Sequence, residues 1–357
     1  MSVFIKSFGH YLPENIIKNT DFLGHRFRFK GSSSIPEADS ASIVEKFEEV
    51  TDIQSRYYRS QDETASQMGI YAAKNALDKA NVDAKDLELI ICAHNWGDQS
   101  YVAGNIQYDV LPNLASRIKY ELNIDSMDCT AFDINFGCTG FIEGLKIAEA
   151  LMIVQNKKLA LVIGADTVSS VIDPEDINSM LFGDGAGAAV LSSQASEGLN
   201  AEIICSKTFS ICKADNKYLR MEKTSPQTSN SNLRLKMDGA KVFQTALQFV
   251  PELLTSMFHD FNVPSSDMKY LILHQANPKM MHCLKAKISR ELGLPNDSYM
   301  PLMVDKMGNN SVASIPVVLS SLLNNDLEHP SPNIGDKILL CSFGAGMHVN
   351  AMILHLN

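Results

Sequence analysis

Several short motifs that identify common classes of protein are missing from this sequence of 357 residues. It has no Cys-x-x-Cys pair and no His-Glu-x-x-His motif, so we expect no metal site. The Gly-Lys-Ser/Thr sequence of a phosphate-binding loop is also missing. No secretory leader and no long uncharged apolar run occurs, which argues against secretion and against a membrane span.

Positive charge is scarce as well. The chain carries 31 Lys and Arg against 41 Asp and Glu, which gives a net charge of -10 and an isoelectric point near 5.4. Nucleic acid and anionic membranes attract basic proteins, so we expect neither as a partner. The seven cysteines follow no disulfide pattern, which suits a reducing compartment. We therefore expect a soluble, cytoplasmic protein.

An internal repeat is the first positive feature. Residues 83–95 resemble residues 265–277, and residues 182–191 resemble residues 342–351. With 45% apolar residues, a chain of this length can bury a large core. We therefore expect two copies of one α/β unit.

The boundary between the two copies is predicted in the polar segment 192–198, which shows no apolar periodicity. This gives an N-terminal half, residues 1–195, and a C-terminal half, residues 196–357. The Gly-x-Gly-x-Gly sequence at 183–187 raises the alternative of a dinucleotide site. A dinucleotide fingerprint opens a helix, whereas residues 188–191 have the pattern of a strand. We therefore expect no nucleotide and no other cofactor.

Cys138 is the strongest candidate for a nucleophile. A strand-like run at 133–136 precedes it, Gly137 permits a sharp turn, and residues 139–155 have helical apolar spacing. The unpaired N–H groups at a helix N-terminus favour the thiolate, which is the reactive form of cysteine. An isolated intracellular cysteine is more often a buried small apolar residue, but this position argues for chemistry.

His274 and Asn309 are weaker candidates when each is taken alone. His274 follows the apolar run 270–273, so it stands at the end of a probable buried strand, where α/β sites commonly assemble. Pro278 nearby predicts the first turn of a helix. Asn309 lies in a Gly-Asn-Asn-Ser segment that a turn and a helix N-cap would also explain.

The combination of motifs resembles the condensing enzymes of the thiolase superfamily, and most closely β-ketoacyl-acyl-carrier-protein synthase III. The order and the spacing of the motifs match, and the resemblance spans nearly the whole chain. Histidine with asparagine is the pairing of the synthase III and chalcone-synthase branches, and the surrounding segments favour the former. The matching segments are Cys138 with Gly140-Phe141, His274 to Asn277, Gly308 to Ser314 and Phe343 to Gly346.

The resemblance implies a thiolase-like duplicated α/β fold with α/β/α/β/α layers. It also implies an acyltransferase that condenses an acyl-Cys138 intermediate with a malonyl- or ketoacyl-type thioester by decarboxylation. His274 Nε2 and Asn309 Nδ2 would stabilise the enolate oxygen of that second thioester. The backbone N–H groups of Cys138 and Gly346 would form a hole for the other oxyanion.

The resemblance further implies three kinds of partner: an acyl carrier protein, acyl-carrier or acyl-CoA thioesters as substrates, and a second copy of the chain in a homodimer. Carrier proteins of this family are acidic, so docking requires a basic patch. A solvated helix face explains the candidate residues equally well on spacing alone, but the family's carrier contacts lie in this helix. The candidates are Lys279, Lys285, Lys287 and Arg290.

The departures from the family leave the substrate open. Lys46 and Val50 occupy the positions of the usual coenzyme A contacts, which weakens the interpretation that acetyl-CoA is the primer. Residues 26–36 form either a surface loop or a basic lip, and residues 207–235 are interpreted as an exposed excursion. Trp96 lines an acyl tunnel or simply closes the core. Two alternatives stay open: a specialised enzyme of secondary metabolism that joins two β-ketoacyl units or only transfers an acyl group, and a non-catalytic partner subunit.

Overall fold

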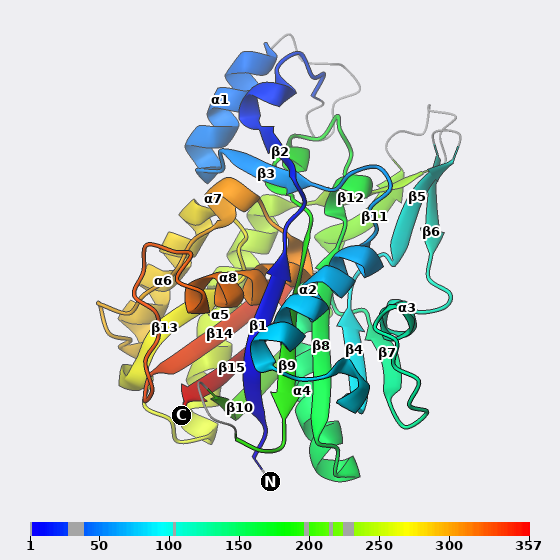
Figure 1. Ribbon diagram of the computed structural model, residues 1–357. Coiled ribbons are helices and arrows are strands. Elements are labelled where there is room, and N and C mark those ends of the chain that lie inside the picture. Colours follow the sequence, from blue (N-terminus) through cyan, green and yellow to red (C-terminus); the bar gives the residue numbers. More distant parts are fainter. Residues whose placement is uncertain (1, 28–38, 103–104, 196–199, 214–216, 224–231) are drawn as a thin grey trace.

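The computed structural model describes residues 2–27, 39–102, 105–195, 200–213, 217–223 and 232–357 (Figure 1). Residues 28–36 of the predicted basic lip lie outside the described residues. The predicted boundary between residues 195 and 196 is described only on its N-terminal side, because residues 196–199 also lie outside them.

A mixed β-sheet forms the framework of the molecule (Figure 1). Its strands are β1 (Phe4–Tyr11), β4 (Leu89–Ala93), β7 (Thr130–Ile134), β8 (Leu159–Asp166), β9 (Gly185–Ser192), β10 (Ala201–Ser210), β13 (Met268–Leu273), β14 (Lys337–Gly344) and β15 (His348–Leu356). In the described part of the chain, their order across the sheet is β13-β14-β15-β10-β1-β9-β8-β4-β7.

The strand order repeats on the two sides of the sheet. On one side β4 runs parallel to β8, and β8, β9 and β1 follow as antiparallel neighbours. On the other side β13 runs parallel to β14, and β14, β15 and β10 follow in the same way. Within the described residues, the two sides join where Phe4 and Ile5 of β1 pair with Glu202 and Ala201 of β10. This order supports the predicted duplication, while the division into 1–195 and 196–357 stays a prediction.

The helices form three layers around the two sides of this sheet. Buried apolar side chains form three clusters. One lies between the two halves of the sheet, one covers the outer face of the N-terminal half, and one covers the outer face of the C-terminal half. The predicted α/β/α/β/α arrangement of layers is confirmed, because apolar side chains cover both faces of each side. The middle helices are α4 (Gly140–Gln155) and α8 (Ser314–Leu323), and the outer helices are α2 (Ala65–Ala80), α3 (Leu114–Glu121), α5 (Gly239–Asp260) and α6 (Pro278–Leu292).

Smaller elements gather at one end of the sheet, around the site described below (Figure 1). Hairpins β5–β6 and β11–β12 lie side by side there, since Tyr108 donates a hydrogen bond to the carbonyl of Leu233 over 3.3 Å. None of the described helices is both long and apolar enough to cross a membrane. The elements are α1 (Ser40–Thr51), β2 (Asn15–Lys18), β3 (Ser55–Tyr58), β5 (Asp98–Val102), β6 (Asn105–Asp109), β11 (Leu219–Lys223), β12 (Leu233–Met237), α7 (Val304–Met307), and the short 3-10 helices η3 (Gly137–Thr139) and η8 (Ser311–Ala313).

Candidate active site

Cys138 lies in η3, between the end of β7 and the first turn of α4, as the sequence predicts. Gly137 adopts a φ of +61°, and a Cβ at that position would lie 2.9 Å from the backbone nitrogen of Ala345. From the other half of the molecule, Gly344 approaches so closely that a Cβ there would lie 2.7 Å from the nitrogen of Cys138. Glycine at both positions therefore lets β14 pack directly against the turn that holds Cys138.

Burial raises the pKa of the Cys138 thiol to about 11, although the hydrogen bond between Cys138 and Ser311 opposes this shift. The negative charge of Asp166 raises the pKa further. The expectation that the helix N-terminus alone would favour the thiolate is therefore wrong, because desolvation outweighs it. With this pKa, the resting sulfur is a protonated thiol.

Ser311 is the residue that connects the candidate groups. Its hydroxyl oxygen lies 3.4 Å from Cys138 Sγ and accepts a hydrogen bond from Asn95 Nδ2 over 3.1 Å. Its backbone N–H donates to Asn309 Oδ1 over 2.9 Å. Because that bond occupies the amide oxygen, the Nδ2 group of Asn309 is the end left to act as a donor. The sequence motif contained Ser311, but spacing alone gave it no role.

His274 stands directly after β13, as predicted, and is 2% exposed. Its Nδ1 lies 2.7 Å from Ser314 Oγ, which also accepts a hydrogen bond from the backbone N–H of Gln275 over 3.4 Å. The Ser314 hydroxyl is thus assigned as the hydrogen-bond donor to Nδ1 of His274. Nε2 of His274 therefore carries the ring proton and is an N–H donor. Burial lowers the pKa of His274 to about 3, so the ring is neutral.

Asn309 is held in place by backbone bonds to the glycine-rich segment. Its N–H donates to the carbonyl of Leu181 over 2.8 Å, and its carbonyl accepts from Gly183 over 3.0 Å. A Cβ at Gly183 would lie 2.4 Å from the carbonyl of Met307. The segment continues into strand β9, so the interpretation that it is not a dinucleotide fingerprint is supported, and its glycines serve close packing beside Asn309.

A pocket of about 240 Å³ opens beside Cys138. Trp96 lines it, which agrees with the first of its two predicted roles. Hairpin β11–β12 also lines it, although residues 207–235 were expected to form only an exposed excursion. The sequence of a short hairpin does not indicate which distant residue its side chains will contact. The contribution of β11–β12 to the pocket beside Cys138 was therefore missed. The lining residues are Asn95, Trp96, Asn135, Gly137, Cys138, Val168, Phe182, Leu219, Arg220, Met221, Leu235, Ser311 and Ala345.

Gly346 lies in the tight turn between β14 and β15. Its φ is +122°, and a Cβ there would lie 2.2 Å from Nε2 of His348. The His348 ring in turn stacks on Phe136, with ring centroids 4.1 Å apart. The backbone at 346 is therefore left bare beside the turn of Cys138, and its role in an oxyanion hole stays a prediction.

The predicted carrier-docking residues all lie on α6, which begins at Pro278 as expected. All four already have partners, and Arg290 lies 3.7 Å from Glu291. The Nζ of Lys279 lies 3.1 Å from Asp52, that of Lys287 lies 2.8 Å from Glu291, and that of Lys285 donates to the carbonyl of Ser298 over 2.6 Å. Arg290 is the most exposed of the set, with its side chain 73% exposed.

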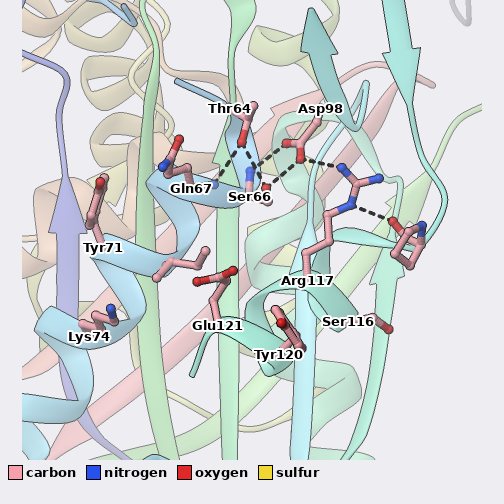
Figure 2. Close-up of a pocket in the computed structure, with 12 residues that line it drawn as sticks. Thr64, Ser66, Gln67, Tyr71, Lys74, Asp98, Ser116, Arg117, Tyr120 and Glu121 are labelled. Carbon is pink, nitrogen blue, oxygen red and sulfur yellow. Dashed lines mark hydrogen bonds and ion pairs between the residues drawn. The ribbon is translucent and has the colours of Figure 1, made fainter. Parts of the chain in front are cut away.

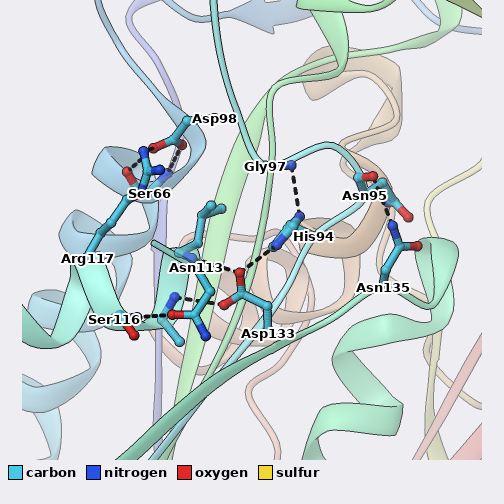
Figure 3. Close-up of polar contacts among 12 residues, drawn as sticks. Ser66, His94, Asn95, Gly97, Asp98, Asn113, Ser116, Arg117, Asp133 and Asn135 are labelled. Carbon is cyan, nitrogen blue, oxygen red and sulfur yellow. Dashed lines mark hydrogen bonds and ion pairs between the residues drawn. The ribbon is translucent and has the colours of Figure 1, made fainter. Parts of the chain in front are cut away.

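His94 follows β4 as His274 follows β13, and it has a structural environment (Figure 3). Its Nδ1 accepts a hydrogen bond from the N–H of Gly97 over 2.9 Å, so Nε2 carries the proton that is shared with Asp133 at 2.9 Å. Asp133 also accepts the backbone N–H groups of Leu114 and Ala115 at the start of α3. His94 is thus held between Gly97 and Asp133, and through Asp133 it is connected to the start of α3.

A second hollow, of about 640 Å³, lies on the outer surface between α2 and α3 (Figure 2). Arg117, which lines it, forms an ion pair with Asp98 at 2.9 Å. A second ion pair joins Arg117 to Asp109 at 2.6 Å. Asp98 also accepts from the N–H and hydroxyl of Ser66 at the start of α2. The bonds to Ser66 tie Asp98 to the first turn of α2, and none of the residues that line this hollow is a cysteine or a histidine.

Comparison with known proteins agrees with this geometry. The sequence matches the family described as 3-oxoacyl-[acyl-carrier-protein (ACP)] synthase III over residues 132–210, and the C-terminal part of that family over residues 258–356. It is 32% identical over 362 residues to the β-ketoacyl-[acyl-carrier-protein] synthase III of Clostridium beijerinckii, with 99% of each chain covered.

Solved structures give the same result. The crystal structure of 3-oxoacyl-(acyl carrier protein) synthase III from Pseudomonas aeruginosa is 25% identical and superimposes with a TM-score of 0.79, covering 99% of this chain and 98% of that one. The priming β-ketosynthase from the R1128 polyketide biosynthetic pathway is also 25% identical, with a TM-score of 0.79 and coverages of 99% and 96%.

The fold and these matches define a thiolase-like condensing acyltransferase. Within that class, the chain belongs to the 3-oxoacyl-[acyl-carrier-protein] synthase III family.

Proposed function

We propose that Cys138 carries an acyl group during a two-step condensation. The observation that carries this proposal is the position of the thiol at the wall of a largely apolar pocket, where Ser311 connects it to Asn309. In the first step, a bond forms between the sulfur and a thioester carbonyl carbon, and the carbon–sulfur bond of the donor breaks. One thioester replaces another, so the acyl group is stored at little cost.

In the second step, a malonyl- or ketoacyl-type thioester loses carbon dioxide, and the electron pair left behind places negative charge on its carbonyl oxygen. The N–H of His274 Nε2 and the Nδ2 group of Asn309 would donate hydrogen bonds to that oxygen. The resulting carbon nucleophile attacks the acyl carbonyl and expels the sulfur of Cys138. A histidine that stays neutral suits this role, because it can donate without losing its proton to the enolate.

Backbone N–H groups of Cys138 and Gly346 would bind the oxyanion formed on the acyl carbonyl. The bare backbone at Gly346 supports this assignment, because any side chain there would collide with His348. Donors fixed in the backbone need no reorganisation when the charge develops.

An acyl carrier protein is the proposed donor. Lys46 and Val50, at the positions of the usual coenzyme A contacts, are both exposed on α1, and Lys46 is paired with Glu49 at 2.8 Å. Helix α6 would receive the acidic carrier through Lys279, Lys287 and Arg290, with Lys285 fixed beside them. The acidic groups already paired with these cations would have to give way to those of the carrier.

A specialised ketosynthase, which joins two β-ketoacyl units or only transfers an acyl group, is the second candidate function. The changed coenzyme A positions favour it, and so does Arg220, a charged residue at the wall of the pocket. A non-catalytic partner subunit would have no use for an intact Cys138, His274 and Asn309, so we do not propose that role.

Mass spectrometry of the intact protein tests the proposal. The same acyl chain is offered on carrier protein, on coenzyme A and on N-acetylcysteamine, and the mass increment on the chain is followed with time. We expect loading in the wild type and in Cys212→Ala, an exposed-cysteine control, and no loading in Cys138→Ala. An unchanged increment in Cys138→Ala would show that the nucleophile is another residue.

The same assay tests the donor. Reversing the charge of Lys279, Lys287 and Arg290 should slow loading from carrier protein at least tenfold and leave loading from N-acetylcysteamine unchanged. Added salt should act in the same direction, because exposed charges are screened over about 10 Å at 0.1 M ionic strength. Loading from acetyl-CoA that is fast and insensitive to both changes would contradict carrier delivery.

The chain is further proposed to act as a cytoplasmic homodimer. Strand β7 lies at the edge of the sheet, and the segment that precedes it in the chain, residues 105–129, carries exposed apolar side chains. Large exposed apolar patches mark interaction sites. The reduced thiol that the chemistry needs supports a reducing compartment. The exposed apolar residues are Tyr108, Val110, Leu111, Tyr120 and Met127.

A further inference from the structure

The wall of the pocket beside Cys138 contains one full charge. Among the described residues that line it, only Arg220 is charged, and the rest are apolar residues, glycine, one thiol, one hydroxyl and two amides. In pockets of this kind, a few polar groups decide which ligand binds and how it lies. The guanidinium of Arg220 is therefore the group on this wall that can distinguish a charged acyl chain from a neutral one.

Strand β11 brings Arg220 to this wall. Leu219 and Met221, its neighbours on the strand, line the same pocket, so apolar side chains flank the guanidinium. Across the hairpin, the residue opposite Arg220 is Lys236, whose ammonium group is already paired with Asp173. Of these two facing cations, Arg220 is thus the one that lines the pocket and can bind a ligand there.

Arg220 is held by a local ion pair. Its Nη2 lies 2.5 Å from Glu222 Oε2, two residues along the same strand, and its Nη1 donates to the carbonyl of Lys217 over 3.2 Å. The side chains of Arg220 and Glu222 are 38% and 52% exposed. An ion pair with this exposure contributes little to stability, because water screens it. A carboxylate that enters the pocket can therefore replace Glu222 without breaking a strong interaction.

We propose that the pocket selects acyl groups that carry a second, free carboxylate, and that Arg220 binds this carboxylate. The guanidinium presents parallel N–H groups that match the two oxygens of a carboxylate. The inference rests on the proposed role of Cys138 as acyl acceptor, and it names the substrate class for that role: thioesters of dicarboxylic acids.

The free carboxylate takes no part in the covalent step. At Cys138 a carbon–sulfur bond to the acyl group forms, the donor's carbon–sulfur bond breaks, and the thiol proton leaves on the released donor thiol. Arg220 thus determines which acyl group is bound, and it does not change the thioester exchange itself.

The apolar part of the wall makes the charge more selective. Phe182 is buried, and Trp96 and Leu235 are partly buried, on the same wall as Arg220. Charge interactions strengthen where water is excluded. A neutral acyl chain of equal length would contact the same apolar residues but leave the guanidinium with Glu222. The expected preference is therefore one of charge and not of length.

Binding is measured first, without acyl transfer. Trp96 is the only tryptophan of the chain and lines this pocket, so its fluorescence reports occupation. In the Cys138→Ala protein, glutaryl and adipoyl thioesters of N-acetylcysteamine are titrated against their terminal-amide analogues, which have the same length and no charge. We expect the carboxylate forms to bind at least fivefold more tightly.

Variants made in the same background assign this preference to one residue. Arg220→Gln should reduce it to less than twofold and leave binding of the amide forms unchanged, whereas Arg220→Lys should keep part of it. Glu222→Gln should maintain or increase it, because the competing carboxylate is removed. The matched control is Lys223→Gln, which removes an exposed cation of β11 outside the pocket wall and should keep the full preference.

Equal binding of the carboxylate and amide forms, or a preference that survives in Arg220→Gln, would overturn the inference. The phosphate of a phosphopantetheine arm is the other anion that could reach Arg220. Binding of neutral pentanoyl thioesters of N-acetylcysteamine and of phosphopantetheine is therefore compared, and a loss in Arg220→Gln confined to the phosphopantetheine form would also overturn it. Because these titrations use a chain without Cys138, they stand apart from the loading assay, whose failure would refute the proposed acyl acceptor alone.

Discussion

At the scale of single residues, the site combines groups that burial has made neutral. The thiol of Cys138 and the imidazole of His274 are both held in the uncharged form, with pKa values moved to about 11 and about 3. An ion pair between them is therefore not the resting state, and each group depends on a different serine, Ser311 or Ser314. The two half-reactions should accordingly be separable by mutation.

His274→Ala should keep acyl loading of Cys138 within threefold of the wild type and lower the rate of carbon–carbon bond formation by roughly a hundredfold or more, since one oxyanion donor is lost. Loading is measured by intact mass and condensation by product analysis in a single turnover. Ser170→Ala, at another buried serine, is the control for general damage. Equal loss of both steps would argue for a Cys138–His274 ion pair.

The residue types in the site could be predicted from the sequence, but their environments could not. Cys138, His274 and Asn309 each stand in a motif that can be recognised in this one sequence, by the order and spacing of the motifs. Asp166 belongs to no motif of its own and reaches the site only because β8 ends beside the turn after β4. The direction of the thiol pKa shift depends on burial, which a helix N-terminus in the sequence does not reveal.

At the scale of secondary-structure elements, the β11–β12 hairpin decides the size of the pocket. Leu219 and Met221 from one strand and Leu235 from the other face Cys138's pocket, which holds about 240 Å³. The strands and helices of the core were predictable from apolar periodicity and from the repeat. The role of the hairpin was not predictable, because it depends on where the tertiary fold places the hairpin and not on the hairpin's own sequence pattern.

Met221→Trp should therefore shift loading toward shorter acyl chains. The larger side chain fills part of the pocket, and each buried methylene of a substrate is worth about 0.8 kcal/mol. We expect the ratio of octanoyl to acetyl loading from N-acetylcysteamine thioesters to fall at least tenfold. Glu222→Gln, which follows Met221 but is absent from the pocket wall, should leave the ratio unchanged. A ratio in Met221→Trp equal to that of the wild type would mean that the acyl chain lies elsewhere.

At the scale of the whole molecule, the proposed homodimer would pair the exposed edge of β7 and cover the apolar residues beside it. Tyr120 stands on α3 at the rim of the hollow in Figure 2, and Leu111 is 82% exposed. A stable protein interface buries about 800 Å² per partner, so an edge strand and its neighbouring helix are an adequate platform.

Light scattering after size-exclusion chromatography should give twice the chain mass of 39.3 kDa for the wild type and the single mass for the double variant Leu111→Glu, Tyr120→Glu. Two buried charges without partners are expected to abolish association. The control is Ile334→Glu, an equally exposed apolar residue in the loop before β14, which should remain dimeric. A wild-type mass of one chain would contradict the proposal.

The contact of Gly344 with the Cys138 turn has a consequence for the newly made chain. Cys138 is synthesised about two hundred residues before the strand that shapes its surroundings, and Ser311 is synthesised almost as late as that strand. Until that strand and Ser311 have docked, Cys138 has neither its pocket nor its hydrogen-bond partner. Under the proposed role of Cys138, an unfinished chain should therefore not react with thioesters, and acylation of Cys138 would report that the distant parts of the chain have come together.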